Sequence, residues 1–578
     1  MKSTSTFLMI FTFIAFVYCG NDNFTCEIPM SDCIKAWCMM NNSNASLPTA
    51  QKTNLAIYSS HTIQDLGDYK QCVKYSNISR YVLAQIQEIS SGSTFYFGFC
   101  GPVNCSADEY NDVYPLIQQY FEVNIPQLNN TNATFIDPQQ IEPESDFAFI
   151  FIIILMSAVI SMGICGSYIG SLTREKKKKS FALPAGTDSS KDDSNPSLYQ
   201  SLMPFMNELE NRKPTPIRVL ECFDLTKNYE SLIKEEKKPG HDDGLQVFAG
   251  LRFLAFAWVV YSHTCMQMSG YLKNMDIIGN YMNSWSFLVL YGGFYAVDIF
   301  FFLSGFMAAY MIISKSKKLV ASPANYFKIV LHRIFRIWPA YFVCIFIFWR
   351  IVPYLGSGPL WFAEISQSNQ CNDTWWQNLL FINNLMITEP TDVSCFDWGW
   401  YISVDMQIFL LVPLICWSYT YKKNFGRVII FVSILISIAV GFAYSLYTNF
   451  PYEVPPNNLT FNVWKHLYVN PVVRAAPYIL GALFGILYQK FKSGEERNLF
   501  HILSEQKCLS YLVSFIGLAL TLLIVFLPRD PQTSGQQWPD WWAYTWQVLS
   551  RPLYTLGLFL FVAPCLLGYI GTLKSILT

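Results

Sequence analysis

The sequence predicts an all-α polytopic membrane protein of about nine transmembrane helices, preceded by a small, disulfide-rich and mainly helical luminal domain. Apolar residues make up 52% of the 578 positions and charged residues only 14%, whereas soluble domains average roughly 25% charged residues. Apolar runs long enough to cross a bilayer recur along the chain, and cysteines and glycosylation sequons gather before the first long run. The net charge of −1 and the lack of a basic patch interleaved with aromatic residues favour no nucleic-acid partner.

Residues 1–20 have the pattern of a secretory signal peptide. Lys2 precedes the apolar stretch "FLMIFTFIAFVY", and the small residues Cys19 and Gly20 follow at a plausible cleavage site. The alternative is a first anchored helix, although this apolar run is short compared with a span of about 20 residues.

Residues 21–145 are predicted to form a cysteine-rich, N-glycosylated luminal or extracellular domain. Six cysteines form a framework whose pairing the sequence leaves open: Cys26, Cys33, Cys38, Cys72, Cys100 and Cys105. Seven N-x-S/T sequons fall in the same stretch: Asn23, Asn41, Asn44, Asn77, Asn104, Asn129 and Asn132. Both features indicate the secretory pathway, so we expect a protein of the endoplasmic reticulum, another endomembrane or the plasma membrane.

The first transmembrane helix is predicted within residues 146–170, which are almost entirely apolar. The basic run "REKKKK" at 174–179 follows at once, and the positive-inside rule places it in the cytosol. Residues 171–244 are rich in Ser, Pro, Lys, Glu and Asp and are expected to form a mostly flexible cytosolic linker. Within it, "IRVLECFDLTKNYESL" is a candidate for a short helix near the membrane.

Residues 245–578 are predicted to form a multi-pass membrane domain with eight further spans. The apolar runs lie near 246–268, 288–313, 336–355, 401–419, 428–447, 473–490, 509–527 and 548–570. In this order the cytosolic loops carry most of the lysines and arginines. The luminal loops receive the sequons at Asn372 and Asn458 and the pair Cys371 and Cys395, as the positive-inside rule requires.

The stretch "LRFLAFAWVVYSHT" at 251–264 places two ionisable residues, Arg252 and His263, in an apolar span. Eleven residues turn a helix through almost three turns, so both side chains share one face about 16 Å apart. His263 is the one histidine of six that falls within a predicted span, and a neutral imidazole can accept a proton. The alternative is a histidine that only forms a hydrogen bond to a neighbouring helix.

Two carboxylates lie in other apolar spans, Asp298 in "YAVDIFFFLSGF" and Asp405 in "WGWYISVDMQIFLL". Both spans enter from the luminal side, so we expect these acids at a depth similar to that of His263. An acid can orient an imidazole for proton abstraction, and buried acids need a partner. The alternative is a polar cluster that only holds the helices together.

Arginines mark both sides of the predicted membrane domain. Arg333 and Arg336, in "LHRIFRIWPAY", lie on the same side as Arg252, and together these three could bind phosphates. The alternative is the ordinary positive charge of a cytosolic face. Arg474 and Arg551 begin spans from the luminal side, against the positive-inside trend, so we expect each to have a specific partner. No P-loop, G-x-S-x-G or H-E-x-x-H motif is present, and we expect no metal ion.

Six stretches follow one another along the chain: "LRFLAFAWVVYSH", "AVDIFFFLSGFMAAY", "LHRIFRIWPAY", "WWQNLLFINN", "WGWYISVDMQIF" and "VVRAAPYILGALFGIL". In this order the six stretches resemble the motifs of the integral-membrane acyltransferase family 3, in the animal branch named for "nose resistant to fluoxetine" proteins. Near the N-terminus, "LGDYKQC" and "FCGPVNCS" resemble the cysteine-rich module of that branch. Family members generally continue one or two spans beyond the position of Thr578, so the resemblance implies either a bundle that is one or two helices short or a sequence that is a fragment of a longer one.

The resemblance implies transfer of an acyl group from cytosolic acyl-CoA to a hydroxyl acceptor at the luminal side. Acyl-CoA would be a co-substrate, without a permanently bound cofactor, and the acceptor would be a lipid, a sterol, a sugar or a protein. His263 would be the catalytic residue, with Arg252 as its companion. We expect Asp298 or Asp405 to orient His263, and the CoA phosphates to bind near Arg252, Arg333 and Arg336.

A second hypothesis is a non-catalytic carrier of lipids or small amphiphiles that uses the same helical bundle. The buried acids and His263 would then serve proton coupling or substrate binding. A third is a receptor-like protein that acts through its N-terminal domain. Consumption of acyl-CoA would distinguish the first hypothesis from the second.

Overall fold

A computed structural model describes much of the chain, including most of the membrane domain. The described residues are 69–74, 79–88, 94–103, 105–111, 131–138, 147–181, 215–233, 243–269, 281, 284–314, 322–388, 394–448, 461–495, 497–528 and 538–569. The predicted signal peptide, Cys26, Cys33, Cys38 and the sequon at Asn458 lie outside these residues. Contacts divide the chain into two units, residues 144–242 and the remainder.

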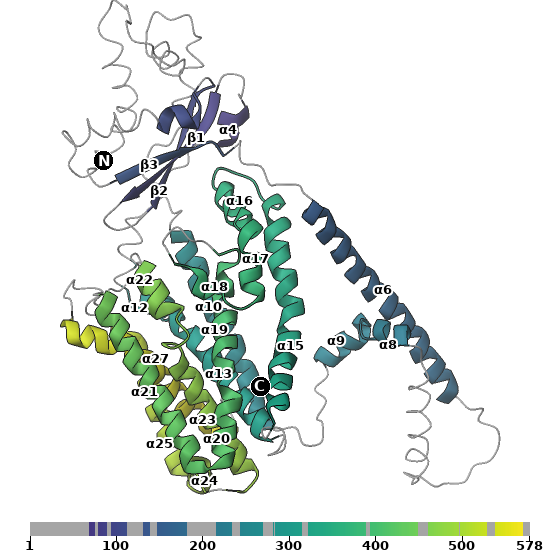
Figure 1. Cartoon of the computed structure of the whole chain (residues 1–578), viewed down its shortest axis with the longest axis vertical. Helices are drawn as coiled ribbons and strands as arrows, with labels where there is room; N and C mark the ends of the chain where they lie inside the picture. Colours follow the sequence, from purple (N-terminus) through teal and green to yellow (C-terminus); the bar gives the residue numbers. More distant parts are fainter. Residues whose placement is uncertain are drawn as a thin grey trace, which may run out of the picture. The chain divides into compact units, whose positions relative to one another are not determined.

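The membrane domain is a bundle of helices, coloured teal to yellow in Figure 1. Its long helices are α10 (Val247–Ser269), α13 (Gly293–Ser314), α15 (Pro323–Arg350), α21 (Lys423–Thr448), α23 (Ala475–Lys492), α25 (Lys507–Phe526) and α27 (Asp540–Leu566). Its shorter helices are η2 (Asp243–Gln246), α12 (Trp285–Tyr291), η3 (Val352–Tyr354), α16 (Trp361–Asn369), α17 (Cys371–Leu379), α18 (Asn383–Met386), η4 (Asp397–Gly399), α19 (Trp400–Phe409), α20 (Val412–Tyr421), α22 (Phe461–Val463), η6 (Trp464–Tyr468) and α24 (Leu499–Glu505). The predicted all-α polytopic architecture is confirmed.

Eight helical segments of the described chain are long and apolar enough to cross a membrane, where the sequence predicted about nine. The expected span near 473–490 is the helix α23, which is not among the eight. Its buried surface is rich in Gly, Ala and Tyr, because it faces other helices instead of lipid. The helices α19 and α20 form one span that is interrupted before Pro413, where proline cannot donate a backbone hydrogen bond.

Glycines bring α13 and α23 into backbone contact at the centre of the bundle. A Cβ at Gly305 would lie 2.0 Å from the carbonyl oxygen of Tyr478, and one at Gly481 would lie 2.0 Å from that of Phe302. Without a side chain at these positions the two helix backbones can approach closely, which is how small residues support helix packing in membranes. The same contact continues at Gly485, where a Cβ would lie 2.3 Å from the carbonyl oxygen of Phe306.

The described part of the N-terminal domain is built around a three-stranded antiparallel sheet with the order β2-β1-β3, shown at the top of Figure 1. Its strands are β1 (Ser79–Glu88), β2 (Thr94–Pro102) and β3 (Thr131–Ile136), and the short helix α4 (Tyr69–Lys74) precedes them. A mainly helical domain was expected, whereas most of the described residues of this domain lie in strands. Aromatic and β-branched residues in "SRYVLAQIQE" and "TFYFGFCGP" favour strands.

Two disulfides join pairs of cysteines that both lie in the described residues. Cys72 of α4 pairs with Cys100 of β2, within a small core that also contains Tyr81 and Phe362 of α16. Cys371 pairs with Cys395 and closes the loop that holds α17 and α18. Both bonds lie on the side of the chain that the sequence predicts to be luminal, where disulfides are stable.

The second unit consists of one long helix and a helical hairpin. The helix α6 (Phe147–Phe181) contains the predicted first span and continues beyond it. The helices α8 (Thr215–Glu221) and α9 (Leu225–Ile233) pack against α6 and form the hairpin. The sequence suggested one short helix within the predicted flexible linker. The structure has two helices there, α8 and α9.

Candidate functional site

The continuous helix α10 carries both Arg252 and His263, as predicted. Val259 lies between them on the same face, since the spacings of seven and four residues are close to whole helical turns. Val259 packs against the buried core that includes Phe301 and Val404. Arg252 and His263 are themselves exposed at the edge of this contact.

At one end of this face, Arg252 lies near two residues of other helices. It is close enough to Arg336 of α15 and Tyr401 of α19 for its charge to interact with both groups. Neither Arg252 nor Arg336 forms a salt bridge with a carboxylate anywhere in the described chain. Two neighbouring guanidinium groups without a carboxylate repel each other, and an anion between them would remove that repulsion.

Beyond them, Arg333 of α15 is held in a polar cluster that joins four helices. Its Nη2 donates hydrogen bonds to the carboxylate of Asp405 on α19 and, at 2.9 Å, to the hydroxyl of Ser304 on α13. The Ser304 hydroxyl lies 3.1 Å from the hydroxyl of Tyr478 on α23. The guanidinium also lies over the ring of Phe409, 4.1 Å from its centroid.

Tyr401 connects this cluster to Arg252. The charges of Asp405, Arg333 and Arg252 all act on its phenol group. Tyr401 precedes Asp405 by four residues on α19, so both side chains lie on one face of that helix. This spacing could have identified Tyr401 from the sequence, but the aromatic residue was not singled out there.

The carboxylate of Asp298 lies in a separate cluster and is completely buried. One oxygen accepts a hydrogen bond from Arg474 Nη1 at 2.9 Å, and the other accepts one from Arg551 Nη1 at 3.0 Å. Arg474 Nε also donates to the carbonyl oxygen of Tyr468 at 2.7 Å, and its guanidinium lies 4.4 Å from the centroid of that ring. The expectation that Arg474 and Arg551 have specific partners is therefore confirmed, and both bind the same carboxylate.

His263 is exposed, and its Nδ1 lies 2.9 Å from the carbonyl oxygen of Val259. Among the described residues, no hydrogen bond joins His263 to Asp298 or Asp405, the two acids expected to orient it. Both acids bind arginines instead, because a permanently charged guanidinium with several donors satisfies a buried carboxylate better than an imidazole does. The catalytic roles of His263, Asp298 and Asp405 stay predictions.

The contact between His263 and Val259 determines which ring nitrogen is available for chemistry. A carbonyl oxygen only accepts hydrogen bonds, so Nδ1 carries the proton in the neutral ring. Nε2 is then unprotonated and can accept a proton. The backbone carbonyl of the preceding turn thus fixes the tautomer, a role that a carboxylate has in many catalytic triads.

The arrangement places two arginines near one end of a face of α10 and an imidazole further along the same face. Arg252 and Arg336 provide the positive charge, and His263 lies about 16 Å further along the helix axis. Within the described residues, no group of three or more His, Cys, Asp or Glu side chains could hold a metal ion.

A protein-family profile described as an acyltransferase domain matches residues 247–572 of the chain. The chain is also similar to nose resistant to fluoxetine protein 6 of Caenorhabditis elegans, with 24% identity over 392 residues, covering 63% of this chain and 45% of that protein. The chain is also similar to regulator of hypoxia-inducible factor 1 of Caenorhabditis elegans. The identity is 23% over 301 residues, covering 47% of this chain and 56% of that protein. The chain spans about half the length of these curated relatives. No solved structure shows significant similarity to it.

Proposed function

Because the chain belongs to the integral-membrane acyltransferase family 3, we propose that it transfers an acyl group from acyl-CoA to a hydroxyl group. In this proposal the donor enters from the cytosol and the acceptor lies at the luminal or extracellular side. The observation that carries the proposal is the single face of α10 that joins Arg252, beside Arg336, to His263.

The two neighbouring arginines are proposed to bind the phosphates of CoA. Guanidinium groups bind phosphate oxygens in pairs, and neither Arg252 nor Arg336 is occupied by a carboxylate of the described chain. Arg333 was assigned to the same role, but its Nη2 already binds Asp405 and Ser304. We therefore propose that Arg333 supports the site by fixing α13, α15 and α19 around Tyr401.

His263 is proposed to act as the general base. Its Nε2 takes the proton of the acceptor hydroxyl while the oxygen attacks the thioester carbonyl carbon. A carbon–oxygen bond forms, the carbon–sulfur bond breaks, and the proton passes from His263 to the departing CoA thiolate. The thioester is already a reactive acyl donor, so proton transfer by one positioned imidazole supplies the help that this reaction requires.

The first test measures the release of free CoA in membranes that contain the full-length protein. General-base help is typically worth 10²–10⁴-fold, so His263→Ala should lower turnover by at least about 100-fold at an unchanged protein level. Thr264→Val is the matched control, since Thr264 is the next exposed residue of α10 and points away from this face. Full turnover in a folded His263→Ala variant would overturn the proposal.

A carrier of lipids or small amphiphiles is the second candidate function. The buried ion pairs of Asp298 and Asp405 favour it, since intramembrane charges often line transport routes. A carrier would move a labelled acyl lipid across vesicle membranes without consuming acyl-CoA. Release of free CoA that depends on His263 would exclude a purely non-catalytic carrier.

A further inference from the structure

Three glycines on α6 form a path along which the α8–α9 hairpin rests. A Cβ at Gly166 would lie 2.3 Å from the carbonyl oxygen of Leu220, and one at Gly170 would lie 1.9 Å from the carboxylate of Asp224. At Gly163, the side chain of Leu225 lies 3.5 Å from the corresponding position. Any larger side chain at Gly166 or Gly170 would displace the hairpin, so the hairpin can pack at this position on α6 only because these residues are glycines.

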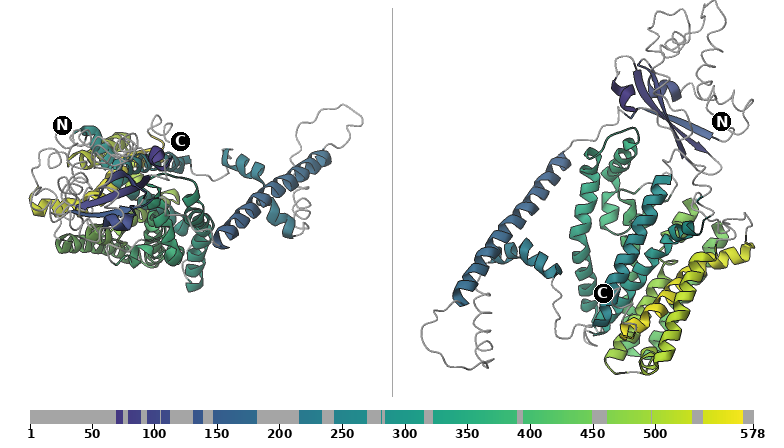
Figure 2. Two further views of the ribbon diagram at one scale, coloured as in Figure 1. Left: turned by 90° about the horizontal axis from the view of Figure 1, so that it is seen from above. Right: turned by 180° about the vertical axis from the view of Figure 1, so that it is seen from behind.

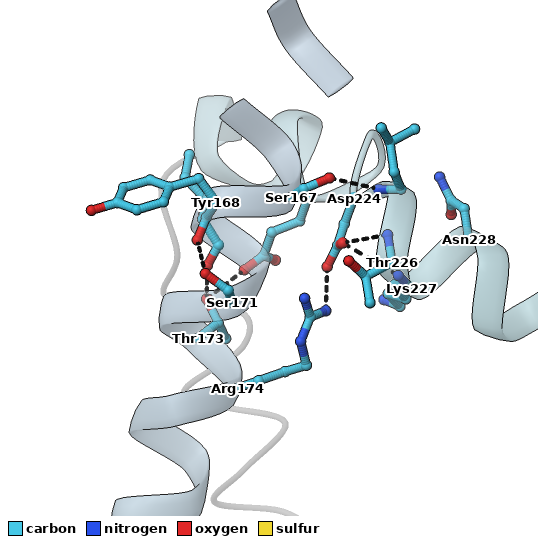
Figure 3. Close-up of polar contacts among 12 residues, drawn as sticks. Ser167, Tyr168, Ser171, Thr173, Arg174, Asp224, Thr226, Lys227 and Asn228 are labelled. Carbon is cyan, nitrogen blue, oxygen red and sulfur yellow. Dashed lines mark hydrogen bonds and ion pairs between the residues drawn. The ribbon is translucent and has the colours of Figure 1, made fainter. Parts of the chain in front are cut away.

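Polar contacts fix the turn of the hairpin to the same helix, as Figure 3 shows. Asp224 is buried and forms a salt bridge with Arg174 of α6. Its other oxygen accepts hydrogen bonds from the backbone N–H groups of Thr226 and Lys227 at 3.1 and 3.2 Å, which caps the start of α9. The hydroxyl of Ser167 accepts a further bond from the backbone N–H of Leu225 at 3.0 Å.

These contacts fall within the part of α6 that is apolar and long enough to cross a membrane. The stretch of α6 suited to cross a membrane is Phe149–Glu175, and the residues that bind the hairpin all lie within it. Ser167 is eight residues before Glu175, so the start of α9 lies about 12 Å inside the end of that stretch. At this level the surroundings are headgroups and acyl chains instead of bulk water.

The free face of α9 is apolar. Tyr229, Leu232 and Ile233 are between 61% and 86% exposed. Their spacing of three and four residues places them on one side of the helix, and the opposite side carries Lys227 and Glu230. An apolar stripe backed by charged residues is the pattern of a helix that lies in a membrane interface.

We propose that the α8–α9 hairpin is an interfacial anchor, with the apolar face of α9 inserted into the leaflet at the Arg174 end of α6. Its partner is the lipid surface itself, and anionic lipids are favoured because "REKKKK" at 174–179 brings a cluster of positive charge to the same end. The anchor holds the segment after α6 at the membrane surface. It is independent of the acyl transfer proposed above.

The test uses full-length protein in vesicles with a benzophenone amino acid placed at position 232 or at position 227. Both side chains are exposed, so neither change should disturb folding. In phosphatidylcholine vesicles with phosphatidylserine, we expect lipid adducts at position 232 to exceed those at position 227 at least fivefold. Adducts should be richer in phosphatidylserine than the vesicle is.

Three outcomes would overturn the proposal. Protein cross-links at position 232 without lipid adducts would mean that the face binds another part of the chain or a second copy. Equal lipid yields at the two positions would mean that the helix does not lie in the interface. No adducts at either position would mean that the face points to the solvent. As a further check, Gly166→Leu should lower the lipid yield at position 232 to the level of position 227.

Discussion

Five arginines of the membrane domain fall into two groups with different surroundings. Arg333, Arg474 and Arg551 bind carboxylates, and a buried pair of this kind holds helices in place. Arg252 and Arg336 lie near each other and bind no carboxylate of the described chain. A ligand anion would stabilise two neighbouring guanidinium groups, which is why we propose substrate binding for this pair.

Replacement of Arg252 should weaken the binding of acyl-CoA more than it slows the reaction. A hydrogen bond to a charged group contributes about 1.5–3 kcal/mol, so Arg252→Gln should raise KM for acyl-CoA roughly 10- to 100-fold, with a smaller change in kcat. Steady-state assays of CoA release would measure both constants. Arg497→Gln removes an exposed arginine paired with Glu505 and should change neither. A normal KM in Arg252→Gln would contradict the assignment.

Among the helices, glycine positions determine which elements touch. At Gly305, Gly481 and Gly485 the backbones of α13 and α23 approach each other. Gly166 and Gly170 admit the α8–α9 hairpin to α6 in the same manner. In a membrane, where lipid is as apolar as leucine, close backbone packing is one of the few forces that join helices. One set of glycines therefore allows α13 and α23 to pack in the bundle, and the other set allows the hairpin to pack on α6.

A side chain at Gly481 should separate α13 from α23. Gly481→Leu should lower the thermal unfolding temperature of the detergent-solubilised protein, since overpacking typically costs about 1–3 kcal/mol or more. Fluorescence-detected size-exclusion chromatography after heating would measure this change. Ala340→Leu enlarges an exposed residue of α15 and should leave the unfolding temperature nearly unchanged. An equal result for both variants would show that the glycine contact is unimportant for stability.

The salt bridge of Asp224 gives the hairpin a defined response to pH. Burial raises the pKa of Asp224, but the hydrogen bonds and charge of Arg174 and the backbone N–H groups of Lys227 and Thr226 hold that pKa below its ordinary value. A lowered pKa contributes stability above the ordinary value of about 3.9, and this contribution is lost as the pH falls below it. The hairpin should therefore stay in place between pH 5 and 7.

Proteolysis of the segment around residue 222 in sealed vesicles would measure this response. We expect equal protection at pH 7 and pH 5 for the wild type, with a protease active at both values. Asp224→Asn should be cleaved faster at either pH, because it loses the charge that binds Arg174. A wild-type hairpin released at pH 5 would contradict the lowered pKa.

On the scale of the whole molecule, one carboxylate joins three helices that are far apart in sequence. Asp298 of α13 binds Arg474 at the start of α23 and Arg551 within α27. The two partners follow it by 176 and 253 residues. Figures 1 and 2 both show these helices side by side in the bundle. The two bonds therefore hold a helix from the first part of the membrane domain against two helices from its last part.

Loss of the Asp298 charge should therefore destabilise the entire bundle. Asp298→Asn leaves two guanidinium groups without their carboxylate, and breaking a buried pair in this way typically costs about 3–5 kcal/mol. The loss would appear as a lower unfolding temperature and a lower yield of folded protein. Asp540→Asn, at an exposed helix start, is the control. If Asp298→Asn were as stable as the control, the cluster would not be a structural closure.

The sequence by itself determined the features that depend on neighbouring residues along the chain. The membrane spans follow from local apolar runs, and the shared face of Arg252 and His263 follows from helical periodicity. Arg474 and Arg551 stood out because their position opposed the charge trend, although their common partner could not be named. The family resemblance rested on short motifs in a fixed order, and the comparisons confirm it.

Only the tertiary structure decided which charged groups meet. It paired Asp405 with Arg333 and Asp298 with two arginines, where the sequence suggested His263 as the partner of either acid. It also formed the N-terminal sheet and seated the hairpin on α6. Helical periodicity fixes directions within one element, whereas a buried carboxylate selects its partner from residues that the packing of several helices brings within hydrogen-bond distance.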